Sequence, residues 1–191
     1  MPSYDSNHAF WQQHYTWPQQ GEEWSEVWGG SEAQWRGTLY PRLAPFLPAA
    51  QLLEIAPGFG RWTHYLQAHT QRLVGVDMAE RCVQACQTRF AHLPHVSFAV
   101  NDGRSLAMIP PHSNDLIFSF DSLVHVDLGI VEAYLAQLAG LLTPHGVVFL
   151  HHANLGAYAP DLPPPEAQHW RDPTVSADAV QALCAAHGLH C

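Results

Sequence analysis

One stretch of the chain, residues 52–62, joins an apolar run to a glycine-rich turn and then to a helical pattern. The apolar residues from Leu52 to Ile55 suit a strand that is buried on both faces. Gly58 and Gly60 allow a sharp turn and leave room for a ligand to approach the backbone. The stretch therefore predicts the first strand, loop and helix of a nucleotide-binding α/β sheet.

From residue 50 on, short apolar runs alternate with helical patterns, which is typical of a mostly parallel sheet covered by helices. We expect strands at 51–56, 72–77, 95–100, 115–120 and 146–152. We expect helices at 62–68, 79–90, 128–142 and 176–187. Residues 189–191 read as the start of a further strand. The stretch 153–173, rich in proline, is too long for a simple connection and predicts binding contacts.

The first 48 residues differ from the rest and predict a helical cap on a domain formed by residues 49–191. A short helix is expected at 22–28, and a second one is expected to begin at Ser31 with Gln34 as its capping-box partner. Two interpretations of this region stay open: packing against the sheet domain, or a lid whose aromatic faces cover a ligand. It holds five of the seven tryptophans: Trp11, Trp17, Trp24, Trp28 and Trp35.

The charge balance excludes several partner classes. Acidic residues outnumber basic ones by 17 to 8, and all the basic residues are arginines scattered along the chain. Nucleic acid and anionic membranes both require a clustered cationic face. With no leader pattern and no apolar run near the roughly 20 residues that span a bilayer, we expect a cytoplasmic protein.

Cysteine and histidine spacing predicts neither disulfides nor a metal site. The four cysteines include no CxxC pair and are expected to be buried thiols. His151 and His152 would point to opposite faces of a strand and could not hold one ion together.

Acidic residues recur at the predicted strand ends: Glu54, Asp77, Asp102 and Asp121. In an open α/β sheet, ligands bind outside the carboxyl ends of the strands, so these side chains should converge on one crevice. A carboxylate about 20 residues after the glycine turn, as Asp77 is, can accept hydrogen bonds from both ribose hydroxyls. The pattern therefore predicts a cofactor that contains adenosine.

Two cofactor classes fit an adenosine site. A dinucleotide fold requires a third glycine, but Thr63 stands at that position. Glu54 would also repel a diphosphate, whereas it suits a cationic ligand such as a sulfonium with an α-ammonium group.

Four segments in order resemble the class I S-adenosylmethionine-dependent methyltransferases, over about residue 50 to the end of the chain. The segments are 54–61 (EIAPGFGR), 74–77 (VGVD), 101–103 (NDG) and 115–121 (DLIFSFD). The resemblance implies an α/β fold: a three-layer sandwich with a mostly parallel, Rossmann-like sheet. The sheet would be truncated after the fifth strand or early in the sixth.

The resemblance also implies a site for S-adenosyl-L-methionine. Glu54 would hold the methionine ammonium, Asp77 the ribose diol, and Asp102 with Gly103 the adenine, while Phe120 and Asp121 would border the methyl group. The full implied cofactor set is Glu54, Ala56, Pro57, Gly58, Gly60, Asp77, Met78, Asp102, Gly103 and Phe120. Ala56 replaces the first glycine of the family pattern, a departure that is tolerable if this position keeps a negative φ.

Methyl transfer needs positioning above all, and a hydroxyl acceptor also profits from a general base. His125 and His152 follow predicted strands and are the candidate bases, with Asp121 as a third catalytic candidate. The acceptor, a small molecule with a hydroxyl or amine, would be bound by the cap and by residues 153–173. That stretch contains Tyr158, His169, Trp170 and Arg171.

If the chain ends at Cys191, we expect the fifth strand to lie at the edge of the sheet, where its apolar side chains are exposed. We expect a second copy of the chain, or a missing C-terminal segment, to cover this edge. Two functions other than methyl transfer stay open: a protein that binds the nucleoside cofactor without turnover, and a weaker candidate, an NAD(P)-dependent oxidoreductase.

Overall fold

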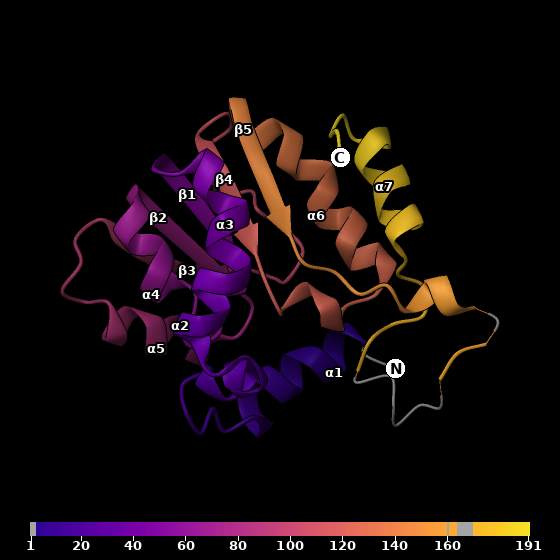
Figure 1. Cartoon of the computed structure of the whole chain (residues 1–191), viewed down its shortest axis with the longest axis horizontal. Helices are drawn as coiled ribbons and strands as arrows, with labels where there is room; N and C mark the ends of the chain where they lie inside the picture. Colours follow the sequence, from indigo (N-terminus) through magenta and orange to yellow (C-terminus); the bar gives the residue numbers. More distant parts are fainter. Residues whose placement is uncertain (1–2, 160, 164–169) are drawn as a thin grey trace.

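A five-stranded sheet forms the centre of the molecule, with the strand order β3-β2-β1-β4-β5 and every neighbouring pair parallel. The computed structural model describes residues 3–159, 161–163 and 170–191. The strands are β1 (Ala49–Ile55), β2 (Thr70–Asp77), β3 (Val96–Val100), β4 (Asn114–Ser119) and β5 (Leu142–Leu150). Their order along the sheet confirms the predicted parallel α/β architecture (Figure 1).

Helices cover both faces of this sheet. They are α1 (Tyr4–Ala9), α2 (Ser31–Gln34), α3 (Tyr40–Leu43), α4 (Thr63–Leu66), α5 (Glu80–Arg89), α6 (Leu128–Leu141) and α7 (Ala177–Ala186). Successive side chains of a strand point to opposite faces. Leu53 accordingly packs in one core cluster with α6 and α7, whereas Leu52 packs in a second cluster with α3 and α4. The result is the three-layer sandwich that the sequence predicts.

Two predicted boundaries near the end of the chain are wrong. Strand β5 begins at Leu142, directly after α6, and ends before His151 and His152. The further strand expected at 189–191 is absent, because the Leu189 amide bonds to the Cys184 carbonyl (2.8 Å) and closes the end of α7. Gly188, with φ +76°, makes that reversal possible.

Residues 4–28 form a segment that we call the N-terminal strap. It comprises α1, a π-helical turn at Phe10–His14 and a 3₁₀ helix at Glu22–Trp28. In Figure 1 it lies at the end of the sheet to which the strand arrows point. Asn7 Nδ2 donates to the His125 carbonyl (2.7 Å), and Arg81 Nη1 donates to the Tyr15 carbonyl (3.0 Å). The strap is thus tied to the segment after β4 and to α5.

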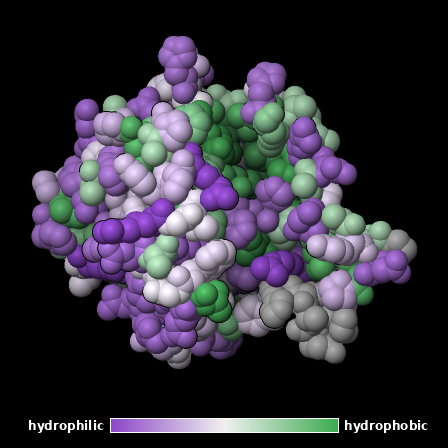
Figure 2. All heavy atoms as spheres, in the orientation of Figure 1, coloured by the Kyte–Doolittle hydropathy of each residue, from purple (hydrophilic) through white to green (hydrophobic). Residues whose placement is uncertain are grey.

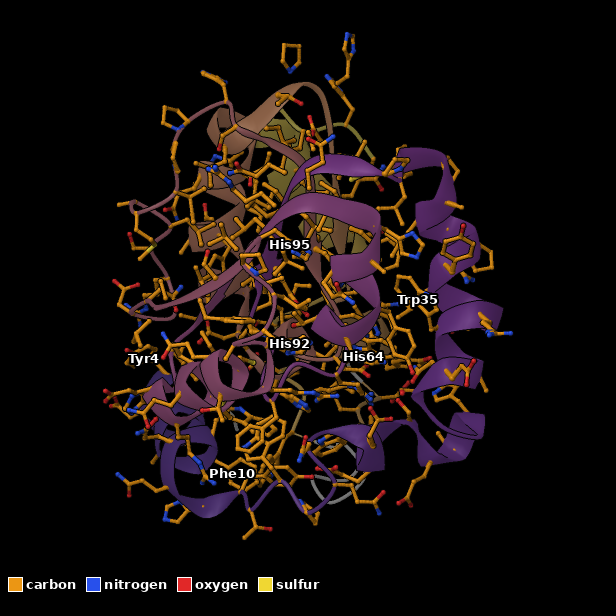
Figure 3. All side chains as sticks on the ribbon, turned by 90° about the vertical axis from the view of Figure 1, so that its left-hand side faces the viewer. Tyr4, Phe10, Trp35, His64, His92 and His95 are labelled. Atoms are coloured by element: carbon orange, nitrogen blue, oxygen red, sulfur yellow. The ribbon has the colours of Figure 1, made fainter. Side chains whose placement is uncertain are left out.

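The helix after the strap does not begin with the predicted capping box. Gly30 is its N-cap residue, and the Ser31 hydroxyl lies 2.7 Å from the Tyr65 hydroxyl instead. A π-helical turn, Trp35–Leu39, then separates α2 from α3. Trp35 stacks on Tyr65, at a ring-centroid distance of 5.3 Å, and lies between these helices and the helix that carries His64 (Figure 3). This tryptophan packs in the core, as one of the two interpretations of the cap proposed.

The outer strand β5 leaves apolar surface exposed. Figure 2 shows hydrophobic side chains gathered over this strand, where Val147, Val148, Phe149 and Leu150 are all half-buried. Among the described residues, no helix has the length and apolar character needed to cross a membrane. Cys82, Cys86 and Cys184 are buried free thiols as expected, while Cys191 is exposed.

Candidate active site

A pocket opens at the carboxyl ends of β1, β2 and β4, beneath the N-terminal strap. The turn after β1, the ends of β2 and β4, and three of the tryptophans of the strap line it. The empty space among the lining residues is about 900 Å³, including the open mouth. Pockets for small molecules and cofactors have volumes of this order, roughly 300–1,000 Å³. Its position matches the crevice that the acidic residues predict.

The glycine turn after β1 shapes the floor of this pocket. Gly58 has φ +58°, and a Cβ atom there would lie 2.5 Å from the ring of Trp17. No side chain therefore fits between this turn and the strap. Gly60 has φ +82° and faces away, since a Cβ there would lie 2.4 Å from the ring of Phe90. Gly58 lines the pocket, whereas Gly60 is not among its described lining residues.

Ala56 departs from the expectation of a negative φ. Its φ is +56°, in the left-handed region that costs an L-residue roughly 1–2 kcal/mol. The surrounding bonds impose this geometry: the Ala56 amide donates to the Val76 carbonyl (2.7 Å), and its carbonyl accepts from the Ser122 hydroxyl (2.7 Å). The condition of a negative φ is therefore not met at Ala56, because these contacts hold its backbone in the left-handed region.

Asp77 ends β2 and lines the pocket with a nearly buried carboxylate. It accepts hydrogen bonds from the amides of Gly58 (3.1 Å) and Ala79 (2.9 Å). Burial raises the pKa of Asp77 to about 6, although these backbone donors oppose the rise. The carboxylate is thus fixed at the pocket wall and has capacity for further hydrogen bonds.

Glu54 lies beneath the glycine turn. Its side chain is 1% exposed and accepts a hydrogen bond from the Thr63 hydroxyl. Burial raises the pKa of Glu54 to about 7, and the Thr63 bond opposes this. Glu54 is not among the described lining residues of the pocket, so direct contact with a bound ammonium stays a prediction.

The turn after β3 contributes a small part of the pocket wall. Gly103 and Met78 line the pocket next to each other, and a Cβ on Gly103 would lie 3.0 Å from the Met78 sulfur. Asp102 is exposed and accepts bonds from the amides of Arg104 and Ser105, which lowers the pKa of this carboxyl. It acts here as a turn residue, and its predicted contact with adenine is untested.

Asp121 lies just after β4 at the other end of the pocket, in the left-handed conformation with φ +63°. Its Oδ2 lies 2.7 Å from Arg61 Nη2, and its Oδ1 lies 3.2 Å from His151 Nδ1. Burial alone would raise the pKa of Asp121, but the His151 and Arg61 contacts hold it below its usual value. Arg61 also donates to the Ser25 hydroxyl (2.8 Å), which connects this ion pair to the strap.

The two candidate bases occupy different surroundings. His125 lines the pocket, with its ring 5.7 Å from that of Trp11. Burial lowers the pKa of His125, although its contact with the Trp170 carbonyl (3.3 Å) opposes this. His152 is not among the described lining residues, and its Nδ1 lies 2.7 Å from the Ala153 carbonyl.

Two buried donors of the pocket have no acceptor within the described parts of the chain. They are the indole N–H groups of Trp17 and Trp62, both of which line the pocket. A buried donor without a partner costs free energy and calls for an explanation. A ligand rich in oxygen would satisfy these donors, so the residues present fit a nucleoside that carries an amino acid group.

The stretch 153–173 contributes at the rim. Trp170 contacts Phe10 of the strap edge to face, with the ring centroids 4.2 Å apart, while Tyr158 is exposed. His169 lies outside the described residues. Within the described chain, no group of three or more His, Cys, Asp or Glu side chains could hold a metal ion.

The structure thus gathers most of the predicted site residues in one place. The predicted site residues that line the pocket are Ala56, Pro57, Gly58, Asp77, Met78, Gly103, Phe120, Asp121 and His125. The sequence reasoning missed Arg61 and His151, the two side chains that contact Asp121. Arg61 directly follows the glycine turn, and this position was the sequence signal that could have identified it as a site residue.

The fold and this pocket define a Rossmann-like protein with a pocket at the carboxyl edge of its sheet. A family model described as a methyltransferase domain matches residues 52–146, about half of the chain. The chain belongs to the class I S-adenosylmethionine-dependent methyltransferases, which confirms the predicted family and cofactor. The match gives no support to the oxidoreductase alternative.

Solved structures share this fold at low sequence identity. The PH0226 protein of Pyrococcus horikoshii OT3 is 17% identical with a TM-score of 0.68, over 93% of this chain and 88% of that one. The N-methyltransferase NodS of Bradyrhizobium japonicum WM9 is 18% identical with a TM-score of 0.59, over 80% and 82%.

A third structure is that of phosphoethanolamine N-methyltransferase 2 of Haemonchus contortus in complex with S-adenosyl-L-methionine. It is 18% identical with a TM-score of 0.71, over 96% of this chain but 44% of that one. This chain therefore spans less than half of the nematode protein. No curated protein matches the chain by sequence.

Proposed function

We propose that this protein transfers a methyl group from S-adenosyl-L-methionine to a hydroxyl or amine of a small molecule. The observation that carries the proposal is the buried Asp77 carboxylate, fixed by the Gly58 amide in the wall of the pocket. Oxygen atoms held in this way accept hydrogen bonds from the two hydroxyls of a ribose. When bound, the cofactor supplies a methyl group activated by its sulfonium.

The chain's own residues would hold the cofactor along the sheet edge. Asp77 would bind the ribose, and Met78 and Gly103 would contact the adenine. The turn at 56–58 would hold the methionine part. Glu54 supports the turn from below, and its predicted role toward the ammonium remains part of the proposal.

The acceptor end of the pocket contains the groups that would position the nucleophile. Phe120, Asp121 and His125 line this end. The Trp170 carbonyl can only accept a hydrogen bond, so the Nδ1 of His125 carries the proton and its Nε2 keeps a lone pair. His125 is therefore better placed than His152 to take a proton from an acceptor.

The division of the chain is part of the same proposal. Residues 49–191 form the methyltransferase domain and residues 1–48 form its cap, which shields the reacting atoms from water. Exclusion of water and fixed positions supply most of the catalysis in such an in-line displacement.

Calorimetry with S-adenosylmethionine, S-adenosylhomocysteine and NAD tests the cofactor. We expect both sulfur nucleosides to bind, and NAD not to bind. Asp77→Ala should weaken binding of S-adenosylhomocysteine by at least ~1 kcal/mol, the scale of a lost charged hydrogen bond. Asp178→Ala is the matched control, because that carboxylate is exposed in the first turn of α7 and outside the described lining of the pocket.

Absence of binding by both sulfur nucleosides would overturn the proposal. Turnover assays on a panel of hydroxyl and amine acceptors then separate an active enzyme from a protein that binds the cofactor without turnover. Methylated product must depend on His125 more than on His152 if the assignment of the base is right.

A further inference from the structure

The N-terminal strap is both aromatic and acidic. Asp5, Glu22, Glu23 and Glu26 fall within its residues 4–28, while the first of the chain's arginines is Arg36. A surface of one sign that borders a cleft raises the local concentration of ligands of the opposite sign. Because the strap covers the pocket, its acidic character favours the approach of a positively charged small molecule.

Three tryptophans of the strap, Trp11, Trp17 and Trp24, line the same pocket. We call them the tryptophan wall. Tyr15 packs against all three, at ring-centroid distances of 5.4, 5.0 and 5.4 Å respectively. The Tyr15 hydroxyl donates to Glu23 Oε1 (2.8 Å), which fixes this central ring. The wall is thus held in place before any acceptor arrives.

The charges in the pocket leave room for a cation. Arg61 is neutralised by Asp121 and lies over the Trp62 ring, 4.4 Å from its centroid. Burial lowers the pKa of His125, so this side chain is neutral near pH 7. Burial raises the pKa of Cys82 and of Tyr134, so both stay neutral near pH 7. Asp77 is then the remaining side chain among the described lining residues that can carry a charge near pH 7, and the wall carries no cation of its own.

From these observations we propose that the acceptor is an alkyl amine, recognised as its ammonium cation by the tryptophan wall. This inference rests on the proposed methyl transfer. The electron-rich faces of tryptophan attract cations more strongly than those of any other aromatic side chain. A neutral acceptor of the same shape gains apolar contact from the wall but not this electrostatic attraction.

The chemistry requires the ammonium to lose a proton before its nitrogen can react. His125 lies beside Trp11 with an unprotonated Nε2, so the proton passes from the ammonium to that atom and then to solvent. The nitrogen lone pair forms the new nitrogen–carbon bond as the methyl–sulfur bond breaks. The electron pair of the broken bond remains on sulfur, which becomes a neutral thioether.

The test compares a cation with its neutral isostere. Calorimetry in saturating S-adenosylhomocysteine measures binding of (2-hydroxyethyl)trimethylammonium and of 3,3-dimethyl-1-butanol, which replaces the charged nitrogen by carbon. We expect the cation to bind at least about fivefold more tightly, as a cation–π contact of about 1 kcal/mol predicts. We also expect Trp24→Leu and Trp11→Leu each to weaken cation binding by about threefold to thirtyfold.

Trp28→Leu is the matched control, since Trp28 belongs to the same strap, is exposed, and is not among the described lining residues. It should leave cation binding unchanged. Binding of S-adenosylhomocysteine to each variant shows that the variant is folded.

Equal binding of the two isosteres, or no effect of Trp11→Leu and Trp24→Leu, overturns the inference even where S-adenosylhomocysteine binds. Failure of S-adenosylhomocysteine to bind the wild-type chain instead overturns the proposed function. In that case the cation is titrated alone, and its selective binding would still support the tryptophan wall as a cation site.

Discussion

Arg61 Nη2 and Asp121 Oδ2 lie 2.7 Å apart, in a contact that joins the residue after the glycine turn to the second residue after β4. The Arg61 side chain is 8% exposed and that of Asp121 is 29% exposed. A pair in such surroundings stabilises mainly because each charge compensates the other. It also fixes one end of the pocket, since Arg61 donates to Ser25 of the strap.

Asp121→Asn should therefore destabilise the fold by about 2 kcal/mol, because the buried guanidinium of Arg61 loses its compensating charge. Urea denaturation measures this loss. The matched control is Glu32→Gln, which breaks an exposed pair with Arg36 whose side chains are 67% and 76% exposed. That change should cost no more than about 0.5 kcal/mol. Similar losses in both variants would contradict a structural role for the Arg61–Asp121 pair.

Binding of S-adenosylhomocysteine should strengthen as the pH rises from 5 to 7.5. The pKa of Asp77 is raised to about 6, so its carboxyl is mostly protonated at pH 5 and accepts ribose hydrogen bonds fully only above pH 6. Calorimetry at several pH values measures the change in affinity. In Asp77→Asn, we expect weaker binding with a flatter pH dependence. An unchanged pH profile in that variant would show that another group controls affinity.

The protein without ligand should become less stable as the pH rises from about 4.5 to 7. Burial raises the pKa of Glu54 to about 7 and that of Asp77 to about 6, whereas unfolded carboxyls lose their protons near pH 4. The unfolded state then binds fewer protons, so the free energy of unfolding falls with pH over this window. Urea denaturation should show a loss of roughly 3–5 kcal/mol for the two groups together. Glu54→Gln should reduce this slope, and a variant with the wild-type slope would argue against a shifted Glu54.

Ala56→Gly should raise the free energy of unfolding by roughly 1 kcal/mol, because glycine adopts a φ of +56° without steric cost. Thermal or urea denaturation measures the gain. Ala79→Gly is the control, since Ala79 has φ −91° and should lose stability on the same change. Destabilisation in both variants would mean that the methyl group of Ala56 contributes more by packing than its backbone strain costs.

The sheet could be predicted from the sequence because each strand is a short apolar run with a polar residue or glycine at its end. The strands from Ala49 to Ser119 are accordingly within about two residues of the predicted limits. The N-terminal helices were harder to predict. Their pattern predicts one continuous helix after Ser31. In the structure, the Ser31 hydroxyl contacts the Tyr65 hydroxyl instead of forming the capping box, and a π-helical turn follows α2. Propensity is a weak guide wherever such packing decides the local structure.

The cofactor end of the site was easier to predict than the acceptor end. Asp77 lies 19 residues after Gly58, and a carboxylate at this spacing after a glycine turn indicates a site for ribose hydroxyls. Arg61 and His151 instead contact Asp121 although they lie 60 and 30 residues away from it along the chain. No local sequence pattern predicts these contacts, because only the strand order β1-β4-β5 brings the three side chains together.

The tryptophan wall gives the protein an intrinsic fluorescence signal for ligand binding. Three of the seven indoles belong to the wall, and the unpartnered Trp62 N–H lies in the same pocket. Indole emission depends on the polarity and hydrogen bonding around the ring, and four of the seven indoles of this chain line the described pocket. Occupation of the pocket can therefore be followed on the unlabelled protein, residue by residue, by replacing one tryptophan at a time.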